Sequence, residues 1–180
     1  MPHRSKNSED FAQELPRYTY VPGLTPHPVS DPRGHWRETR PVCSSPAAAF
    51  DFATQLFNAG YYWEAHEVWE GVWGALGRRG RDADRVKGLI KLAACGVKCL
   101  EQNAEGARRH ASRAAELLTS ASERPLGLAG QDEAITEIPV TVFDRARRLA
   151  ETVMKDPPLP DESARDAAIR GGVPILGQLT

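Results

Sequence analysis

The sequence predicts an all-α protein: a compact helical bundle of two packed helical hairpins plus a C-terminal helix, with an irregular proline-rich N-terminal arm. The first observation is proline placement, because eight of the 14 prolines lie in positions 2–46, six lie from 125 onward, and none lies in 47–124. Proline disrupts helix interiors, so such a window is typical of a helical core. The second observation is that apolar residues in this window recur every three or four positions.

The first hairpin is expected from Ser45 to about Leu76. Ser45 is a suitable N-cap residue, Pro46 suits the first helical turn, and Gly60 ends the first helix. The second helix begins near Tyr61, and its stripe of large apolar residues is expected to face the core. This stripe consists of Tyr62, Ala65, Trp69, Trp73 and Leu76.

The second hairpin and the C-terminal helix complete the predicted domain. Asp82 or Asp84 is expected to cap the third helix, and Asn103 ends it and caps the fourth. A fifth helix is expected from about Val140 to Met154. The predicted organisation is therefore an arm partly packed on the core (1–44), a helical domain (45–155), and a loose or docked C-terminal tail (156–180). The two turns, at 60–65 and 102–107, also suggest tetratricopeptide-like hairpins, although two copies are too few for a solenoid.

Composition and charge exclude several classes of protein. The net charge of −1 gives no overall field for nucleic acid or for an anionic membrane, so neither partner is expected. There is no apolar run of the roughly 18 residues that a membrane span needs, and the first residues lack the apolar stretch of a secretory signal. The cysteines Cys43, Cys95 and Cys99 form no zinc or disulfide pattern. We therefore expect a soluble, cytoplasmic protein.

The densest group of chemically active side chains is the string Glu64-Ala-His66-Glu67-Val-Trp69-Glu70. At about 100° per residue, His66 and Glu70 are neighbours at the edge of the buried stripe, while Glu64 and Glu67 lie towards the far side. Imidazole and carboxylate groups at this spacing can share one divalent metal ion. The carboxylates also repel one another, which can adjust one of them for acid–base catalysis. The alternative is that they pair with basic side chains of the next helix.

The N-terminal arm carries further metal-competent side chains among rigid prolines. His27, Asp31 and His35 lie within a segment that also contains aromatic residues, which low-complexity linkers rarely combine. We expect the arm to lie across the helical core and to bring one of these side chains near His66 and Glu70. The alternatives are an ordered strap whose histidines bond backbone groups, and a disordered tail.

The segment from Phe57 to Trp73, followed by the string Lys87-Gly88-Leu-Ile90, resembles the domain-of-unknown-function 309 (DUF309) family. The arm from Pro22 to His35 is similar to an extension carried by some members of that family. The resemblance covers about residues 20–120. It implies a small all-helical fold with tetratricopeptide-like hairpins, and it implies no established activity.

Two functions from different classes are compatible with these features. The first is a binding or scaffold domain whose pocket, around the Glu-Ala-His-Glu-x-x-Glu helix, holds a small ligand, a protein partner or a second copy of the chain. The residues expected to contact the ligand are Trp63, Glu64, His66, Glu67, Glu70 and Lys91.

The second function is a metal-dependent hydrolase. A divalent metal ion would be bound by His66 and Glu70, with His27 or His35 of the arm completing the site, and Glu67 would be the general base. The sequence does not decide between the two functions, and whether the chain is an enzyme stays open at this point.

Overall fold

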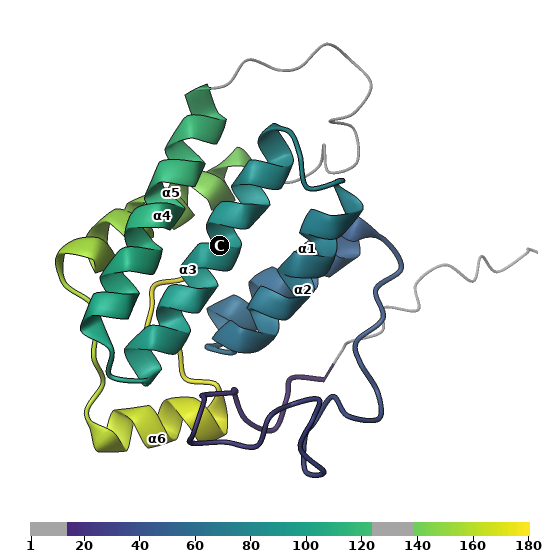
Figure 1. Ribbon diagram of the computed structural model, residues 1–180, viewed down its shortest axis with the longest axis vertical. Helices are drawn as coiled ribbons and strands as arrows, with labels where there is room; N and C mark the ends of the chain where they lie inside the picture. The colour runs from purple at the N-terminus through teal and green to yellow at the C-terminus, as the bar shows by residue number, and fades with distance from the viewer. Residues whose placement is uncertain (1–13, 124–138) are drawn as a thin grey trace, which may run out of the picture.

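The computed structural model describes residues 14–123 and 139–180, and within these ranges it contains six α-helices and no strand (Figure 1). The prediction of an all-α fold is confirmed. The helices are α1 (Pro46–Asn58), α2 (Tyr62–Ala75), α3 (Arg81–Leu100), α4 (Ala104–Glu123), α5 (Val140–Lys155) and α6 (Glu162–Gly171).

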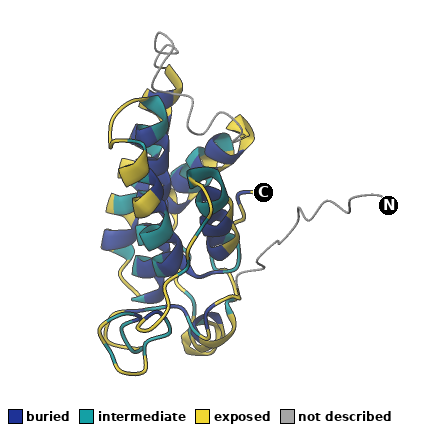
Figure 2. Ribbon diagram, turned by 90° about the vertical axis from the view of Figure 1, so that its right-hand side faces the viewer, coloured by how far each residue is buried: buried dark blue, intermediate teal, exposed yellow. Residues whose placement is uncertain are grey.

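Each of the first four helices packs against the next one along the chain. α1 contacts α2, α2 contacts α3, α3 contacts α4, and α4 contacts α5, which also reaches α3. The two hairpins are thus joined through the α2–α3 interface, as the views of the ribbon also show (Figures 1 and 2). Buried residues run along the facing sides of these helices, and exposed residues lie on the outer sides (Figure 2).

Two of the predicted helix caps are confirmed, and one is wrong. The Ser45 hydroxyl accepts a hydrogen bond from the Ala48 amide (3.1 Å), and the Asn103 side chain accepts one from the Gly106 amide (2.8 Å). The residue that precedes α3 is Gly80, with φ of 94°, rather than an aspartate. Glycine adopts this backbone conformation readily, so the helix begins before Asp82.

The aromatic stripe of α2 is buried in its first half and partly exposed in its second. Tyr62 and Trp69 are fully buried, as predicted. Trp73 is only partly buried, and the cationic groups of Arg78 and Lys87 lie 5.1 and 5.2 Å from the centre of its ring. Cation–π contacts of this kind cover an aromatic ring without placing it in the core.

The C-terminal segment docks on the first hairpin. The Tyr62 hydroxyl accepts hydrogen bonds from the amides of Ile175 (2.9 Å) and Leu176 (2.8 Å), and burial raises the pKa of this phenol. Asn58 similarly accepts a hydrogen bond from the amide of Leu179, whose side chain is fully buried. The sequence did not predict α6, which lies between this segment and α5.

None of the helices in the described residues combines the length and the apolar character that crossing a membrane requires. The tetratricopeptide-like character of the hairpins stays a prediction.

The α2–α3 interface depends on a small residue under the Tyr62 ring, which gives a first testable prediction. A Cβ atom added at Gly96 would lie 2.5 Å from Cγ of Tyr62, whereas one added at Gly74 would have no neighbour within 4 Å. Gly96→Ala should therefore lower the free energy of unfolding by about 1–3 kcal/mol through overpacking. Gly74→Ala is the matched control, and it should raise stability by about 0.5–1 kcal/mol. Urea denaturation measures both, and equal effects would contradict this packing.

Candidate functional site

The candidate residues lie on the first turns of α2, directly after a tight turn. Gly60, at φ of 87°, reverses the chain, and a Cβ atom at this position would lie 2.9 Å from the carbonyl oxygen of Val173. The helix then begins at Tyr62 without a side-chain cap. Glu64 in the first turn is favoured by the positive end of the helix dipole.

Glu64 is fully buried, and within the described residues the proline-rich arm supplies the partners of its carboxylate. Its Oε2 atom accepts a hydrogen bond from the Thr19 hydroxyl (3.0 Å), and its Oε1 atom accepts one from the Tyr20 amide (3.0 Å). The Nε2 atom of His35 lies 3.2 Å from the same Oε1 atom. Glu64 is predicted to lie on the face of α2 away from the apolar stripe, and this face is buried because the arm covers it.

Aromatic side chains hold the arm on the same turn of α2. The ring of Trp63 lies 5.2 Å from Tyr20, 5.4 Å from His27 and 5.9 Å from Trp36, measured between ring centres. Edge-to-face arrangements dominate this group, and each such pair adds roughly 0.5–1.5 kcal/mol beyond area burial. The arm therefore lies across the start of α2, as expected from its aromatic content.

His66, Glu67 and Glu70 form a second group on the partly exposed side of α2. The Nδ1 atom of His66 lies 3.6 Å from Glu67 Oε1, and its Nε2 atom lies 3.8 Å from Glu70 Oε1. One donor atom from each residue can be chosen so that all three lie within 4.8 Å of one another. The neighbouring imidazole of His66 lowers the pKa of Glu67, partial burial opposes this effect, and the positive charges of Arg40 and His27 add to it.

Basic side chains of α3 and α4 border this group. His110 is half-buried, and burial is the main reason that its pKa is lowered. Nearby positive charges lower the pKa of His110 further, and these belong to Lys91, Lys98, Arg109 and His66. Lys91, an expected ligand contact, and His110 therefore share the electrostatic environment of His66.

The arm histidines occupy other positions than the predicted metal site requires. His35 is tied to Glu64, and His27 accepts hydrogen bonds through Nδ1 from the amides of Val29 and Ser30 (both 3.2 Å). Asp31, the third expected side chain, pairs with Arg33 at 3.1 Å. Within residues 14–123 and 139–180, the group of side chains that could hold a metal ion consists of His66, Glu67 and Glu70, without a histidine of the arm.

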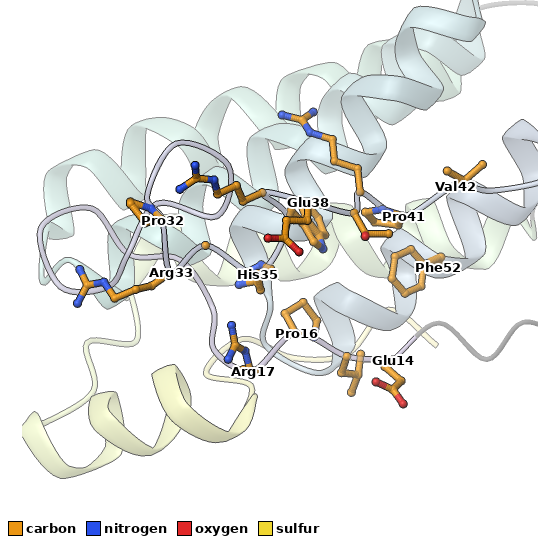
Figure 3. Close-up of a pocket in the computed structure, with 16 residues that line it drawn as sticks. Glu14, Pro16, Arg17, Pro32, Arg33, His35, Glu38, Pro41, Val42 and Phe52 are labelled. Atoms are coloured by element: carbon orange, nitrogen blue, oxygen red, sulfur yellow. The ribbon is translucent and has the colours of Figure 1, made fainter.

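Two cavities adjoin the arm. The first, of about 920 Å³, lies between residues 14–17, residues 32–42 and Phe52, and Figure 3 shows it enclosed largely by loops of the arm. The second, of about 420 Å³, lies between residues 40–46 and the α1–α2 hairpin, and Glu67 is part of its wall. Trp36, Arg40 and Pro41 line both cavities.

Residues 50–110 match the model of the family described as domain of unknown function 309, DUF309. This segment of the chain is a DUF309 domain. No curated protein and no solved structure matches the chain. The family description names no activity, so it adds no role for any residue of the site.

The DUF309 domain supplies only part of the site. It contains Glu64, His66, Glu67 and Glu70, whereas the partners of Glu64 lie in the arm, outside the matched residues. Sequence analysis missed the role of Thr19 as one of these partners. The alternation of Tyr18-Thr19-Tyr20-Val21 was the available signal, since every second residue of an extended segment points to the same side, and Thr19 and Val21 are both fully buried.

Removing the charge of Glu64 should release the arm from the DUF309 domain. Glu64→Gln replaces a carboxylate that accepts from arm donors with an amide that accepts at one atom only, so the unfolding free energy should fall by about 2–3 kcal/mol. The bonds after Arg33 and Arg37 should also be cut faster by trypsin. Glu70→Gln, the same change at an exposed position of α2, is the control and should alter neither property. Similar stability and cleavage in both variants would show that Glu64 does not hold the arm.

Proposed function

We propose that the chain is a small-ligand-binding protein whose pocket lies between the arm and the α1–α2 hairpin, beside the acidic group on α2. The observation that carries this proposal is the burial of Glu64 beneath the arm. A carboxylate held by donors from a loop keeps that loop in one position, and a binding pocket needs walls that are in place before the ligand arrives.

The second cavity has the chemistry of a small-molecule site. Its volume of about 420 Å³ lies within the usual range of ligand pockets, and such pockets combine apolar walls with a few polar groups. Here Ala49, Val68 and Val72 supply apolar wall, while Arg40 and Glu67 are the charged groups. We propose these two charged residues as the groups that orient the ligand.

The expected ligand contacts divide into two roles in this proposal. Glu64 is fully buried and Trp63 packs on the arm, so both position the pocket wall. Glu67 is part of the wall of the second cavity, and His66 and Glu70 lie next to it. We propose their contact with the ligand from that position. Lys91 on α3 adds a positive charge to this region, and the same charge lowers the pKa of His110.

A metal-dependent hydrolase is the second candidate function, favoured by the donors of His66, Glu67 and Glu70 lying within 4.8 Å of one another. Imidazole nitrogen and carboxylate oxygen are suitable ligands for Zn²⁺. Three protein ligands would leave a coordination position for water, as catalytic zinc sites do. Glu67 belongs to this donor set, so its carboxylate would serve either as the third ligand or as the general base.

We also propose a cytoplasmic location, from the state of the thiols on α3. Cys95 and Cys99 are fully buried and form no disulfide. The hydrogen bond with Cys99 and burial both raise the pKa of Cys95, which keeps its thiol protonated and unreactive. Structural thiols of this kind are typical of a reducing compartment.

Filling the second cavity should weaken ligand binding without destabilising the fold. Gly71 lines this cavity, and an added Cβ atom there would have no neighbour within 4 Å. Gly71→Leu should weaken the binding of the neutral fluorescent probe N-phenyl-1-naphthylamine by about tenfold or more, because a leucine occupies the probe's volume. Gly74→Leu is the matched control, since Gly74 has the same free surroundings outside the cavity wall. Equal probe binding in both variants would count against the pocket.

The metal candidate makes a separate prediction. Calorimetric titration of the full chain with Zn²⁺ should show one site, and His66→Ala or Glu70→Gln should weaken it by about tenfold or more, as loss of a direct ligand does. His27→Ala should leave the affinity unchanged, since His27 lies outside the donor set. Absence of stoichiometric binding, or binding that survives His66→Ala, would remove the hydrolase candidate.

A further inference from the structure

The two cavities beside the arm share a wall but differ in the chemistry of their linings. The smaller cavity is bordered by apolar residues of α1 and α2, such as Ala49, Val68 and Val72. The larger cavity is bordered by arginines of the arm. Arg40 and Trp36 line both, so the two cavities adjoin at these two side chains.

The lining of the larger cavity is locally positive, in contrast to the chain as a whole. It contains Arg17, Arg33, Arg37 and Arg40 but only two acidic residues, Glu14 and Glu38, whereas the full chain has a net charge of −1. Figure 3 shows Arg17 and Arg33 among the side chains that the arm contributes to this lining. A concave surface with this charge concentrates anions.

The arginines differ in how far their charge is already neutralised. Arg33 forms two hydrogen bonds with Asp31, at 3.1 Å each, so its guanidinium is engaged. Within the described part of the chain, no hydrogen bond or ion pair engages the guanidinium groups of Arg17, Arg37 and Arg40, although Arg40 is close enough to Glu67 to lower the pKa of that carboxyl group. Arginine binds carboxylate and phosphate groups through two parallel hydrogen bonds, which suits these groups for an acidic ligand.

We propose that the ligand is an amphipathic organic anion: its apolar body lies in the smaller cavity and its carboxylate or phosphate group lies against Arg40 and Arg37. This inference rests on the proposed binding function and adds the chemical class of the ligand. Glu67 lies in the wall of the smaller cavity, and its carboxylate repels an acidic head. The ligand is thereby oriented with its head away from α2 and towards the arginines of the arm.

The test uses the full chain and decyl compounds that differ only in their head groups. Each compound, kept below its micelle concentration, displaces N-phenyl-1-naphthylamine from the protein. Decanoate or decyl phosphate should displace the probe at a concentration about tenfold lower than 1-decanol, as hydrogen bonds to a charged group predict. Whichever acid is stronger identifies the preferred head group. Decyltrimethylammonium should be the weakest, and added salt should reduce the advantage of the acids.

Two variants assign this preference to the arm. Arg40→Gln and Arg37→Gln should each raise the decanoate concentration needed by about tenfold while leaving that of 1-decanol unchanged. Arg79→Gln is the matched control, because Arg79 is exposed and lies outside both cavity linings, and it should change neither value.

The outcomes separate this inference from the function on which it rests. Equal displacement by decanoate and 1-decanol, or no effect of Arg40→Gln and Arg37→Gln, would overturn the anionic ligand and leave the pocket standing. The binding function itself would be overturned if no decyl compound displaced the probe and if Gly71→Leu left the affinity for the probe unchanged.

Discussion

The structure around the site depends on one buried carboxylate. Placing Glu64 out of water is costly unless its oxygens are paired, and the arm provides a hydroxyl, a backbone amide and an imidazole for this purpose. The interaction works in both directions, since it satisfies the acid and fixes an otherwise irregular, proline-rich segment. Both cavities have walls made by that segment, so their shape follows from the position that Glu64 imposes.

The helices could be predicted from the sequence because the information for them is local. A period near 3.6, the Ser45 and Asn103 caps and the proline-free window all act within one turn or one element. The start of α3 was harder to predict, since the positive φ of Gly80 depends on how the preceding loop closes. The position of α6 depended on tertiary contacts of a short, weakly periodic segment, which local patterns do not contain.

The candidate site was predictable to the extent that it lies on one helix. His66 and Glu70 are neighbours because they are four residues apart, and no tertiary contact is needed to bring them together. The burial of Glu64 was not predictable in the same way, because a helical wheel identifies one apolar stripe, and the opposite face of α2 is covered by the arm. The positions of the arm histidines could not be predicted from the sequence for a related reason. In an irregular segment the direction of His35 depends on every preceding turn, and it points to Glu64.

The division between the DUF309 domain and the arm has a consequence for function. The acid lies inside the matched residues 50–110, and its partners lie outside them. A domain with this glutamate but without the arm would expose the carboxylate to water, lose the loop walls of both cavities, and keep only the group of His66, Glu67 and Glu70. In the proposed binding function the helices therefore supply the scaffold and the apolar surface, while the arm supplies the arginines proposed to select the ligand. Ligand preference can accordingly change through the arm alone, without any change to the packing of the helical core.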